Sequence, residues 1–213
     1  MQCNQLYRFV GDAQQRIQED YLRILRYFRF YGRICEEADS HEEETLTAIR
    51  NNVAGMERIS GERIWLEWRK ILSGNFGLQL TVKMVEVGLG PYIGLPSEPA
   101  MSQYEEVVGR ARTIGRTLLP PTQLAALLLD QAEVMRLHAR LKLSAVDRDL
   151  ALFIVTHRHR GPAPQPAPLR PYQFLAVDSK AKLADTRLFI EQLLLYQGEP
   201  ELAKQFAEWT IPR

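Results

Sequence analysis

The feature that most constrains the fold of this 213-residue chain is its helical periodicity. Apolar residues recur at spacings of three and four in nearly every segment, strand-like alternation is scarce, and helix-starting and helix-ending residues separate the segments. The connections between segments are short, which favours antiparallel neighbours. We therefore expect an all-α array of antiparallel helices. The expected helices cover about 12–34, 40–54, 60–73, 75–87, 100–113, 120–129, 131–142, 144–158, 171–176, 181–197 and 199–208.

Three short segments depart from this pattern. Residues 1–11, which include Tyr-Arg-Phe-Val, predict a short residual strand, the last strand of another domain. Residues 91–96 (PYIGLP) predict a rigid turn between two layers of helices. The Pro-rich residues 161–170 predict a stiff, extended linker. At the start of the second helix, Ser40 and Glu43 have the spacing of a capping box.

The composition excludes several kinds of protein. The 27 Lys and Arg residues nearly balance the 26 Asp and Glu residues, so attraction for an anionic partner must come from local clusters. No apolar run reaches the ~20 residues of a membrane-spanning helix, and the first residues lack the pattern of a secretory signal. Cys3 and Cys35 are the two cysteines, so we expect no disulfide framework. No membrane partner is expected.

The basic residues cluster in the first expected helix, in the segment QEDYLRILRYFRFYGR at 18–33. Arg23, Arg26 and Arg29 form an oblique row on the solvent side, which suits an extended anion. Leu22 and Phe30 lie among them, which indicates that this side also meets protein or a base. The opposite face is apolar and is expected to form core. Its members are Ile17, Tyr21, Ile24, Leu25, Phe28 and Tyr31.

Asp20 and Arg23 are expected to be neighbours on this helix. A carboxylate only accepts hydrogen bonds and a guanidinium only donates them. Cytosine and adenine each present an amino donor beside a ring acceptor and complement this pair, whereas uracil and guanine present a carbonyl and an N–H there. The pair is therefore suited to discriminate between bases in a dry site. The alternative is an ordinary surface ion pair beside solvated arginines.

Two other motifs have the residue types of a catalytic or metal site. Asp147 and Asp149 spell Asp-x-Asp at the start of an expected helix, where their carboxylates diverge and Ser144 is placed to cap the helix. His157 and His159 also diverge on a helix, whereas a metal-binding pair needs a spacing of four residues or a loop. We expect neither catalytic residues nor metal ligands in this chain.

The segment EDYLRILRYFRFYGRI resembles the amino-acid template motif, E-D-x-x-R, of the class II tRNA nucleotidyltransferases, the CCA-adding enzymes of the bacterial and eukaryotic type. Within them it is most similar to the animal mitochondrial branch. The segment RISGERIWLEWRKILSG at 58–74 resembles the next motif of that family, and PYIGLP fits the same branch. The first motif is highly specific, and the similarity weakens toward the C-terminal TIPR.

The resemblance implies a division of the chain into functional parts. Residues 1–11 would be the residual last strand of a head domain, and residues 12–74 the neck, whose helices select the nucleotide base. Residues 75–160 would be the body and residues 161–170 the linker. Residues 171–213 would be the start of a tail whose helices hold RNA.

The resemblance also implies roles for individual residues. Asp20 and Arg23 would pair with the base edge, and Arg26 and Arg29 would line the nucleotide site. Glu19 would orient Arg23. In the segment GERI, Glu62 and Arg63 would brace the neck helix, and an ion pair in the first turn of their own helix is the alternative. Arg33 is given no role beyond solvation.

Parts of the family pattern are missing here. The family's head carries a Gly-Gly-x-x-Arg turn and an Asp-x-Asp pair that binds catalytic Mg²⁺, and neither it nor the distal tail is recognised in this sequence. Two-metal phosphoryl transfer requires such carboxylates. We therefore expect a neck-and-body portion that does not transfer nucleotides by itself. The resemblance implies CTP and ATP as the substrates of the intact family. Whether the chain itself is an enzyme stays open.

Three functions remain in view. The first is the part of a CCA-adding enzyme that selects CTP or ATP and holds tRNA. The second is a free-standing helical RNA-binding or interaction module whose basic helix contacts phosphates only. The third is a relative of the poly(A) polymerases, which share a related neck helix. The expected partners are tRNA and nucleoside triphosphates, with a homodimer allowed for, and the expected location is mitochondrial, cytoplasmic or both.

Overall fold

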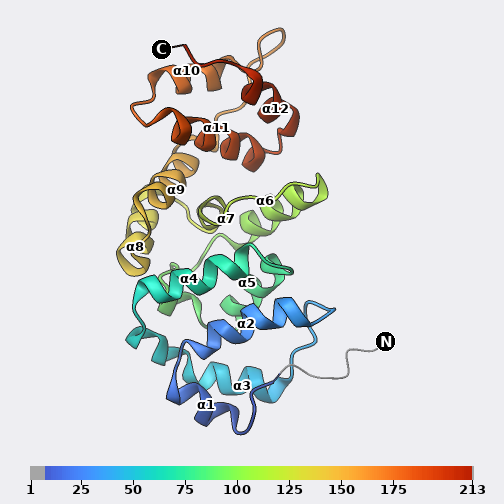
Figure 1. Cartoon of the computed structure of the whole chain (residues 1–213), viewed down its shortest axis with the longest axis vertical. Helices are drawn as coiled ribbons and strands as arrows, with labels where there is room; N and C mark the ends of the chain where they lie inside the picture. The colour runs from blue at the N-terminus through green and yellow to red at the C-terminus, as the bar shows by residue number, and fades with distance from the viewer. Residues whose placement is uncertain (1–7, 213) are drawn as a thin grey trace. The chain divides into compact units, whose positions relative to one another are not determined.

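The computed structural model describes residues 8–212, and these form twelve α-helices and two short 3-10 helices, with no strand among them (Figure 1). The predicted all-α class is therefore confirmed. The chain divides into two compact units, which are described separately. Unit 1 comprises residues 1–99 and 135–143, and unit 2 comprises residues 100–134 and 144–213.

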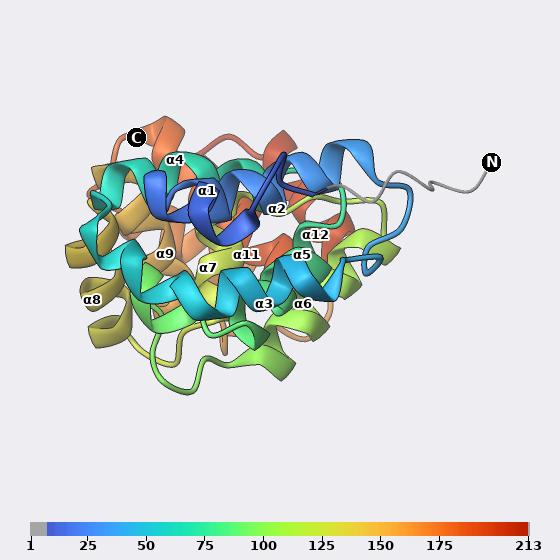
Figure 2. The same cartoon turned by 90° about the horizontal axis from the view of Figure 1, so that it is seen from below.

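Unit 1 is built mainly from five helices. Helix α1 lies beside α3, and α2 packs against both α4 and α5 (Figures 1 and 2). The second half of α8 (Gln131–Leu141) completes the unit. The other elements are α1 (Ala13–Glu19), α2 (Arg23–Ile34), α3 (Glu43–Asn52), η1 (Val53–Arg58), α4 (Gly61–Leu72), α5 (Gly77–Glu86) and η2 (Gly90–Ile93).

The apolar face of α2 lies at the centre of unit 1. Ile24, Leu25 and Phe28 are fully buried, as is Trp68 of α4. Burying one such large side chain contributes about 2 kcal/mol. The predicted core face is confirmed, except that Tyr21 is only half-buried.

The first expected helix is not continuous. Helix α1 ends at Glu19 and α2 begins at Arg23, and the backbone of Asp20 between them is extended, with φ −155° and ψ 102°. The break allows both Ile17 and Leu22 to be buried, although a continuous helix would direct them to different sides. The expectation of one helix is therefore wrong. The shared helical face of Asp20 and Arg23 and the solvent-side position of Leu22 are wrong with it.

Arg140 of α8 holds η1 in place. Its Nη2 donates to the carbonyls of Met56 and Ile59 at 2.9 and 3.1 Å, and its Nε donates to the carbonyl of Tyr92 in η2 at 3.1 Å. Gly61 lies against the main chain of Arg140, where a Cβ would stand 1.8 Å from the carbonyl oxygen. One residue of α8 thus fixes η1, η2 and the start of α4.

Unit 2 is arranged around α11, which contacts α6, α7, α9, α10 and α12 (Figure 1). Residues 161–169 form a loop before α10, in which the N–H of Ala163 donates to the carbonyl of Pro168 at 3.2 Å. The elements of this unit are α6 (Met101–Thr113), α7 (Pro120–Ala126), the first part of α8, α9 (Ala145–His157), α10 (Arg170–Asp178), α11 (Leu183–Gln197) and α12 (Pro200–Glu208).

The two predicted helix caps have different outcomes. The capping box at Ser40 is wrong, because α3 begins two residues too late for it, with Glu42 as its N-cap. The Ser40 hydroxyl instead donates to Glu37 at 2.6 Å. The predicted cap of α9 is confirmed, since the hydroxyl of Ser144 accepts from the N–H of Asp147 at 3.1 Å.

The strand predicted at residues 1–11 falls mostly outside the described residues, and its described part, 8–11, forms no strand. The division into neck, body, linker and tail is functional, so the two units found by contacts do not test it and it stays a prediction. Among the helices of residues 8–212, none has the length and apolar character needed to cross a membrane.

Candidate functional site

Asp20 is fixed at the junction of α1 and α2 by three main-chain groups. Its N–H donates to the carbonyl of Ile17 at 3.1 Å, and its own carbonyl accepts from the N–H of Arg23 at 3.0 Å. Its carboxylate accepts from the N–H of Leu22 at 3.1 Å. A carboxylate at the start of a helix satisfies a free N–H and is favoured by the helix dipole. The break between the helices therefore orients this side chain.

Two arginines flank the Asp20 carboxylate. Arg26 of α2 lies 3.3 Å from Oδ2, and Arg63 of α4 lies 3.7 Å from Oδ1. The side chains of Asp20, Arg26 and Arg63 are 26, 40 and 49% exposed. Ion pairs this exposed contribute only about 0–1 kcal/mol to stability. The junction thus holds an acceptor beside donors at a place that a ligand can reach.

Glu19 binds the arginine that the sequence assigned to Asp20. Nη1 of Arg23 donates to Glu19 Oε2 at 2.5 Å and to the carbonyl of Arg16 at 2.7 Å, and Nη1 of Arg16 donates to the same Glu19 oxygen at 2.8 Å. The hydrogen bond from Arg23 is the main reason that the pKa of Glu19 is lowered. The carboxylate of Asp20 and the guanidinium of Arg23 therefore have different partners.

A third acid, Glu67 of α4, was missed by sequence reasoning. Its Oε2 lies 3.0 Å from Nε of Arg29, and its Oε1 lies 3.5 Å from Nζ of Lys70. The side chains of Glu67 and Arg29 are only 10 and 14% exposed, and the guanidinium of Arg29 lies 4.4 Å from the centre of the Phe30 ring. The sequence held one signal for this acid: the periodicity of α4 places Glu67 next to Trp68, on the buried side of the helix, where an acid needs a partner.

Each of these three acids lies between two basic side chains, so each set keeps a surplus charge of +1. This explains how one short segment tolerates several arginines.

Of the remaining predicted residues, Glu62 is exposed in the first turn of α4. Arg33 is exposed in the last turn of α2. The roles of all these residues in nucleotide binding remain predictions.

The two motifs with the residue types of a metal site are engaged in other contacts. Asp147 lies at the cap of α9, and the carboxylate of Asp149 accepts from Nε of Arg148 at 2.7 Å. His157 is half-buried at the end of α9, and burial is the main reason that its pKa is lowered. Within residues 8–212, no three His, Cys, Asp or Glu side chains lie close enough together to hold a metal ion.

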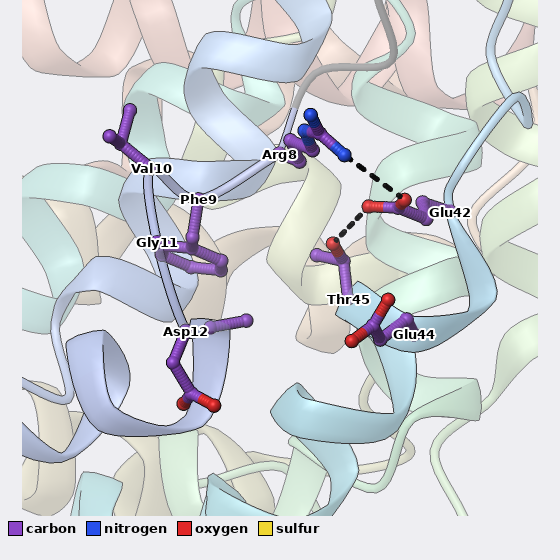
Figure 3. Close-up of a pocket in the computed structure, with 9 residues that line it drawn as sticks. Arg8, Phe9, Val10, Gly11, Asp12, Glu42, Glu44 and Thr45 are labelled. Carbon is purple, nitrogen blue, oxygen red and sulfur yellow. Dashed lines mark hydrogen bonds and ion pairs between the residues drawn. The ribbon is translucent and has the colours of Figure 1, made fainter.

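A cavity of about 450 Å³ lies elsewhere in unit 1, between the segment before α1 and the start of α3 (Figure 3). Arg8 reaches Glu42 across it at 4.0 Å, and the hydroxyl of Thr45 donates to Glu42 at 3.1 Å. Asp12 and Glu44 add negative charge to its lining. An acidic wall repels a triphosphate, and none of the proposed base-reading residues lines this cavity. We therefore place the candidate site at the junction of α1 and α2.

Comparison with known proteins first gives a class. Residues 41–96 match the family model described as "Probable RNA and SrmB- binding site of polymerase A". The match extends over α3, η1, α4, α5 and η2. It therefore includes Arg63 and Glu67, the residues of α4 that contact the arginine-rich segment.

The particular relatives are tRNA nucleotidyltransferases. The chain is 44% identical over 211 residues to human "CCA tRNA nucleotidyltransferase 1, mitochondrial". The aligned region covers 98% of this chain and 48% of that protein. Among solved structures, it resembles the Thermotoga maritima CCA-adding enzyme complexed with tRNA, with a TM-score of 0.59, 18% identity and coverage of 92% of this chain and 49% of that one. A CCA-adding enzyme with ATP gives a TM-score of 0.57 at 17% identity, covering 92% and 48%.

The chain is therefore a relative of the CCA tRNA nucleotidyltransferases over nearly its whole length, as the template motif predicted. It spans about half the length of the curated relatives that it matches. The likeness to the solved structures supports the helical fold alone, because the sequence identity is low.

Proposed function

We propose that this chain is the part of a CCA tRNA nucleotidyltransferase that selects CTP and ATP by their base edges and holds tRNA during 3′-terminal addition. The observation that carries the proposal is the Asp20 carboxylate, fixed at a helix break and flanked by exposed arginines. The names of the relatives and the RNA-binding family model support the reaction and the RNA partner. The human relative's name supports a mitochondrial location and gives no support to a cytoplasmic location.

Base selection follows from the protonation of these groups. An ionised Asp20 accepts from the exocyclic amino group of cytosine or adenine, and Arg23 donates to the neighbouring ring nitrogen. Arg23 must first leave Glu19, which costs little because both side chains of that pair are partly exposed and solvent screens their attraction. Arg26 and Arg63 place two guanidinium groups beside the Asp20 carboxylate. Uracil and guanine would direct a carbonyl oxygen at this carboxylate and are rejected.

The transfer step is assigned to the part of the relatives that this chain does not span. The surplus positive charge at the junction suits the phosphates of a bound nucleotide. We propose that Mg²⁺ and the groups that activate the tRNA 3′ end belong to that other part, so the 213-residue chain binds nucleotides without incorporating them. Incorporation of labelled CMP into tRNA by this chain alone, with magnesium, would contradict the assignment.

The proposal is tested by the dissociation constants of CTP, ATP, UTP and GTP for the purified chain. We expect CTP and ATP to bind at least about tenfold more tightly than UTP and GTP, since leaving buried polar groups unpaired costs more than 1 kcal/mol. Asp20→Ala should remove this preference. Glu44→Ala, which removes an exposed acid of α3, is the matched control and should preserve it.

The two other functions give different results. A module that contacts phosphates only would bind all four nucleotides equally, with a steep dependence on salt concentration. A poly(A) polymerase relative would keep ATP and lose CTP. Joined to a head domain and given tRNA without its CCA end, such a relative would add a long tract of A, whereas the proposed function adds a single CCA.

A further inference from the structure

The residue after Asp20 packs against a glycine. The ring of Tyr21 lies so close to Gly55 of η1 that a Cβ at Gly55 would stand 2.0 Å from both Cδ1 and Cε1 of the ring and 2.4 Å from Cγ. Real Cβ atoms do not approach other atoms to within 3.0 Å. The ring therefore occupies space that is open only because residue 55 has no side chain.

The restriction at Gly55 comes from this ring and not from the backbone. Gly55 is not among the glycines with positive φ, so its backbone conformation is open to other residues. A substitution such as Gly55→Ala consequently tests one steric contact, without the strain that the same change would cause at a left-handed position.

Both sides of the contact are held in place. On the η1 side, Arg140 binds the carbonyl of Met56, the residue after Gly55, at 2.9 Å. On the α1 side, Gln18 donates to Asn52 at 3.2 Å, three residues before Gly55. The guanidinium of Arg58 also lies 5.8 Å from the centre of the Tyr21 ring. Because η1 is fixed, an added methyl group must displace the ring.

Displacing the ring also moves the base-reading carboxylate. Tyr21 stands between Asp20 and Leu22, whose N–H holds the Asp20 carboxylate at 3.1 Å. The carbonyl of Tyr21 accepts from the N–H of Ile24 at 3.1 Å, so Tyr21 also takes part in the first turn of α2. A shift of this residue changes the direction of the Asp20 side chain relative to Arg26 and Arg63.

We infer that Gly55 is a positioning residue for base selection, which acts on Asp20 through the ring of Tyr21. This inference rests on the proposed function and adds a specificity-determining position that touches neither the nucleotide nor the tRNA. The residue pair sets the angle of the carboxylate and leaves the surplus positive charge unchanged. Base preference should therefore fall while the phosphate-driven part of nucleotide affinity is preserved.

The test compares Gly55→Ala with the wild-type chain in binding CTP, ATP, UTP and GTP. We expect the preference for CTP and ATP to fall from at least about tenfold to below about threefold, while UTP affinity stays within about twofold, because the charges are retained. Tyr21→Ala should reduce the preference in the same way, and Tyr21→Phe, which keeps the ring, should retain it.

Two other glycines supply matched controls. A Cβ at Gly109 of α6 meets nothing within 4 Å, so Gly109→Ala should keep the preference and raise stability slightly, because alanine favours a helix interior. A Cβ at Gly32 of α2 would stand 2.8 Å from the carbonyl oxygen of Asn75 and 2.9 Å from Leu80. Gly32→Ala should therefore lower the unfolding temperature and keep the base preference, which separates general destabilisation from positioning.

The outcomes separate the two proposals. A preference that Asp20→Ala removes and that folded Gly55→Ala retains would overturn the inference alone. If Gly55→Ala does not fold, Tyr21→Ala decides, and retention of the preference in that variant has the same meaning. A wild-type chain with no preference, or a preference that survives Asp20→Ala, would overturn the proposed function and the inference with it.

Discussion

Two groups of arginines differ in the acceptors that their guanidinium groups bind. One group lies at the α1–α2 junction, and the other lies at the helix ends of unit 2. At the junction the partners are carboxylates, as with Asp20 and Arg26, and the side chains stay partly exposed. In unit 2, Arg158 donates to the carbonyl of Ala125 in α7 at 3.2 Å and to two carbonyls after α7 at 2.7 and 2.5 Å. Arg110, which also pairs with Glu106, donates to the carbonyl of Tyr196 at the end of α11 at 2.6 Å. A carbonyl-bound arginine completes a helix end, whereas an exposed, carboxylate-bound arginine can exchange its partner for a ligand.

Partner and burial, and not membership of a unit, decide the role of an arginine. Arg140 in unit 1 binds three carbonyls, so it belongs with Arg158. Arg29 binds an acid, Glu67, but both side chains are buried, so exchange would leave a charge without a partner. The sequence places Arg29 in the same row as Arg26, and the structure separates the two.

The largest expected effect is that of Arg158→Ala. Removal of the guanidinium leaves the carbonyls of Leu128 and Leu129 without this donor, whereas that of Ala125 still accepts from the N–H of Leu128, and we expect the free energy of unfolding to fall by about 4 kcal/mol. Urea denaturation followed by circular dichroism measures the change. Arg160→Ala, at an exposed position two residues further on, is the control and should stay within about 0.5 kcal/mol of the wild type. A loss below about 1 kcal/mol for Arg158→Ala would contradict the comparison.

The second expected effect separates Arg29 from Arg26. Arg29→Ala leaves the buried Glu67 carboxylate with Lys70 alone and should lower the free energy of unfolding by about 3 kcal/mol. Arg26→Ala removes an exposed pair and should cost less than about 1 kcal/mol. Adding Glu67→Gln to the Arg29→Ala chain removes the uncompensated charge and should recover part of the loss. Equal losses for the two alanine variants would show that burial does not distinguish them.

Much of the fold follows from periodicity, but the break at Asp20 does not. Ile17 and Ile24 are seven residues apart, so the apolar pattern keeps nearly the same register across the junction. No glycine or proline marks the break, which is stabilised by the burial of Leu22 and by the contact of Tyr21 with η1. A contact with a distant element leaves no local signal in the sequence.

The candidate site was predictable in its residue types and not in its pairing. The acid beside the arginines identified Asp20, and the next motif identified Arg63, which the structure brings together at 3.7 Å. The contact of Glu19 with Arg23 was predicted from the family resemblance, and the structure contains it. The partner of Arg29 could not be predicted, because a helical pattern states which side a residue faces and not which acid reaches it. Glu67 in particular comes from α4, and only tertiary packing brings it to Arg29.

The third expected effect is smaller and uses pH to sharpen the comparison, since arginine–carbonyl bonds do not titrate. In unit 1, His41 lies among aromatic rings: its Nδ1 is 2.8 Å from the Tyr27 hydroxyl, and its ring centre is 3.9 Å from that of Tyr31. The pKa of His41 is lowered to about 4, mainly by burial. The nearby positive charge of Lys83 also lowers this pKa, and the negative charge of Asp39 opposes the shift. His41 is therefore neutral in the folded chain at pH 5.

The sign of the pH effect follows from linkage. The unfolded chain has the ordinary histidine pKa of about 6.5, so below that pH it binds a proton that the folded chain does not. The stabilisation is complete above about pH 6.5 and is lost as the pH falls toward the folded value of about 4. Between pH 7.5 and 5.0 we expect the free energy of unfolding to decrease by about 2 kcal/mol, a window in which Glu19, whose pKa is lowered mainly by its hydrogen bond from Arg23, stays ionised.

Urea denaturation at the two pH values, followed by the fluorescence of Trp65 and Trp68 in unit 1, measures this decrease. His41→Gln removes the titrating group and should abolish most of the decrease. His157→Gln, whose histidine has its pKa lowered in the same direction in unit 2, is the matched control and should leave most of it. A decrease that persists in His41→Gln would contradict the assignment of the acid sensitivity to His41.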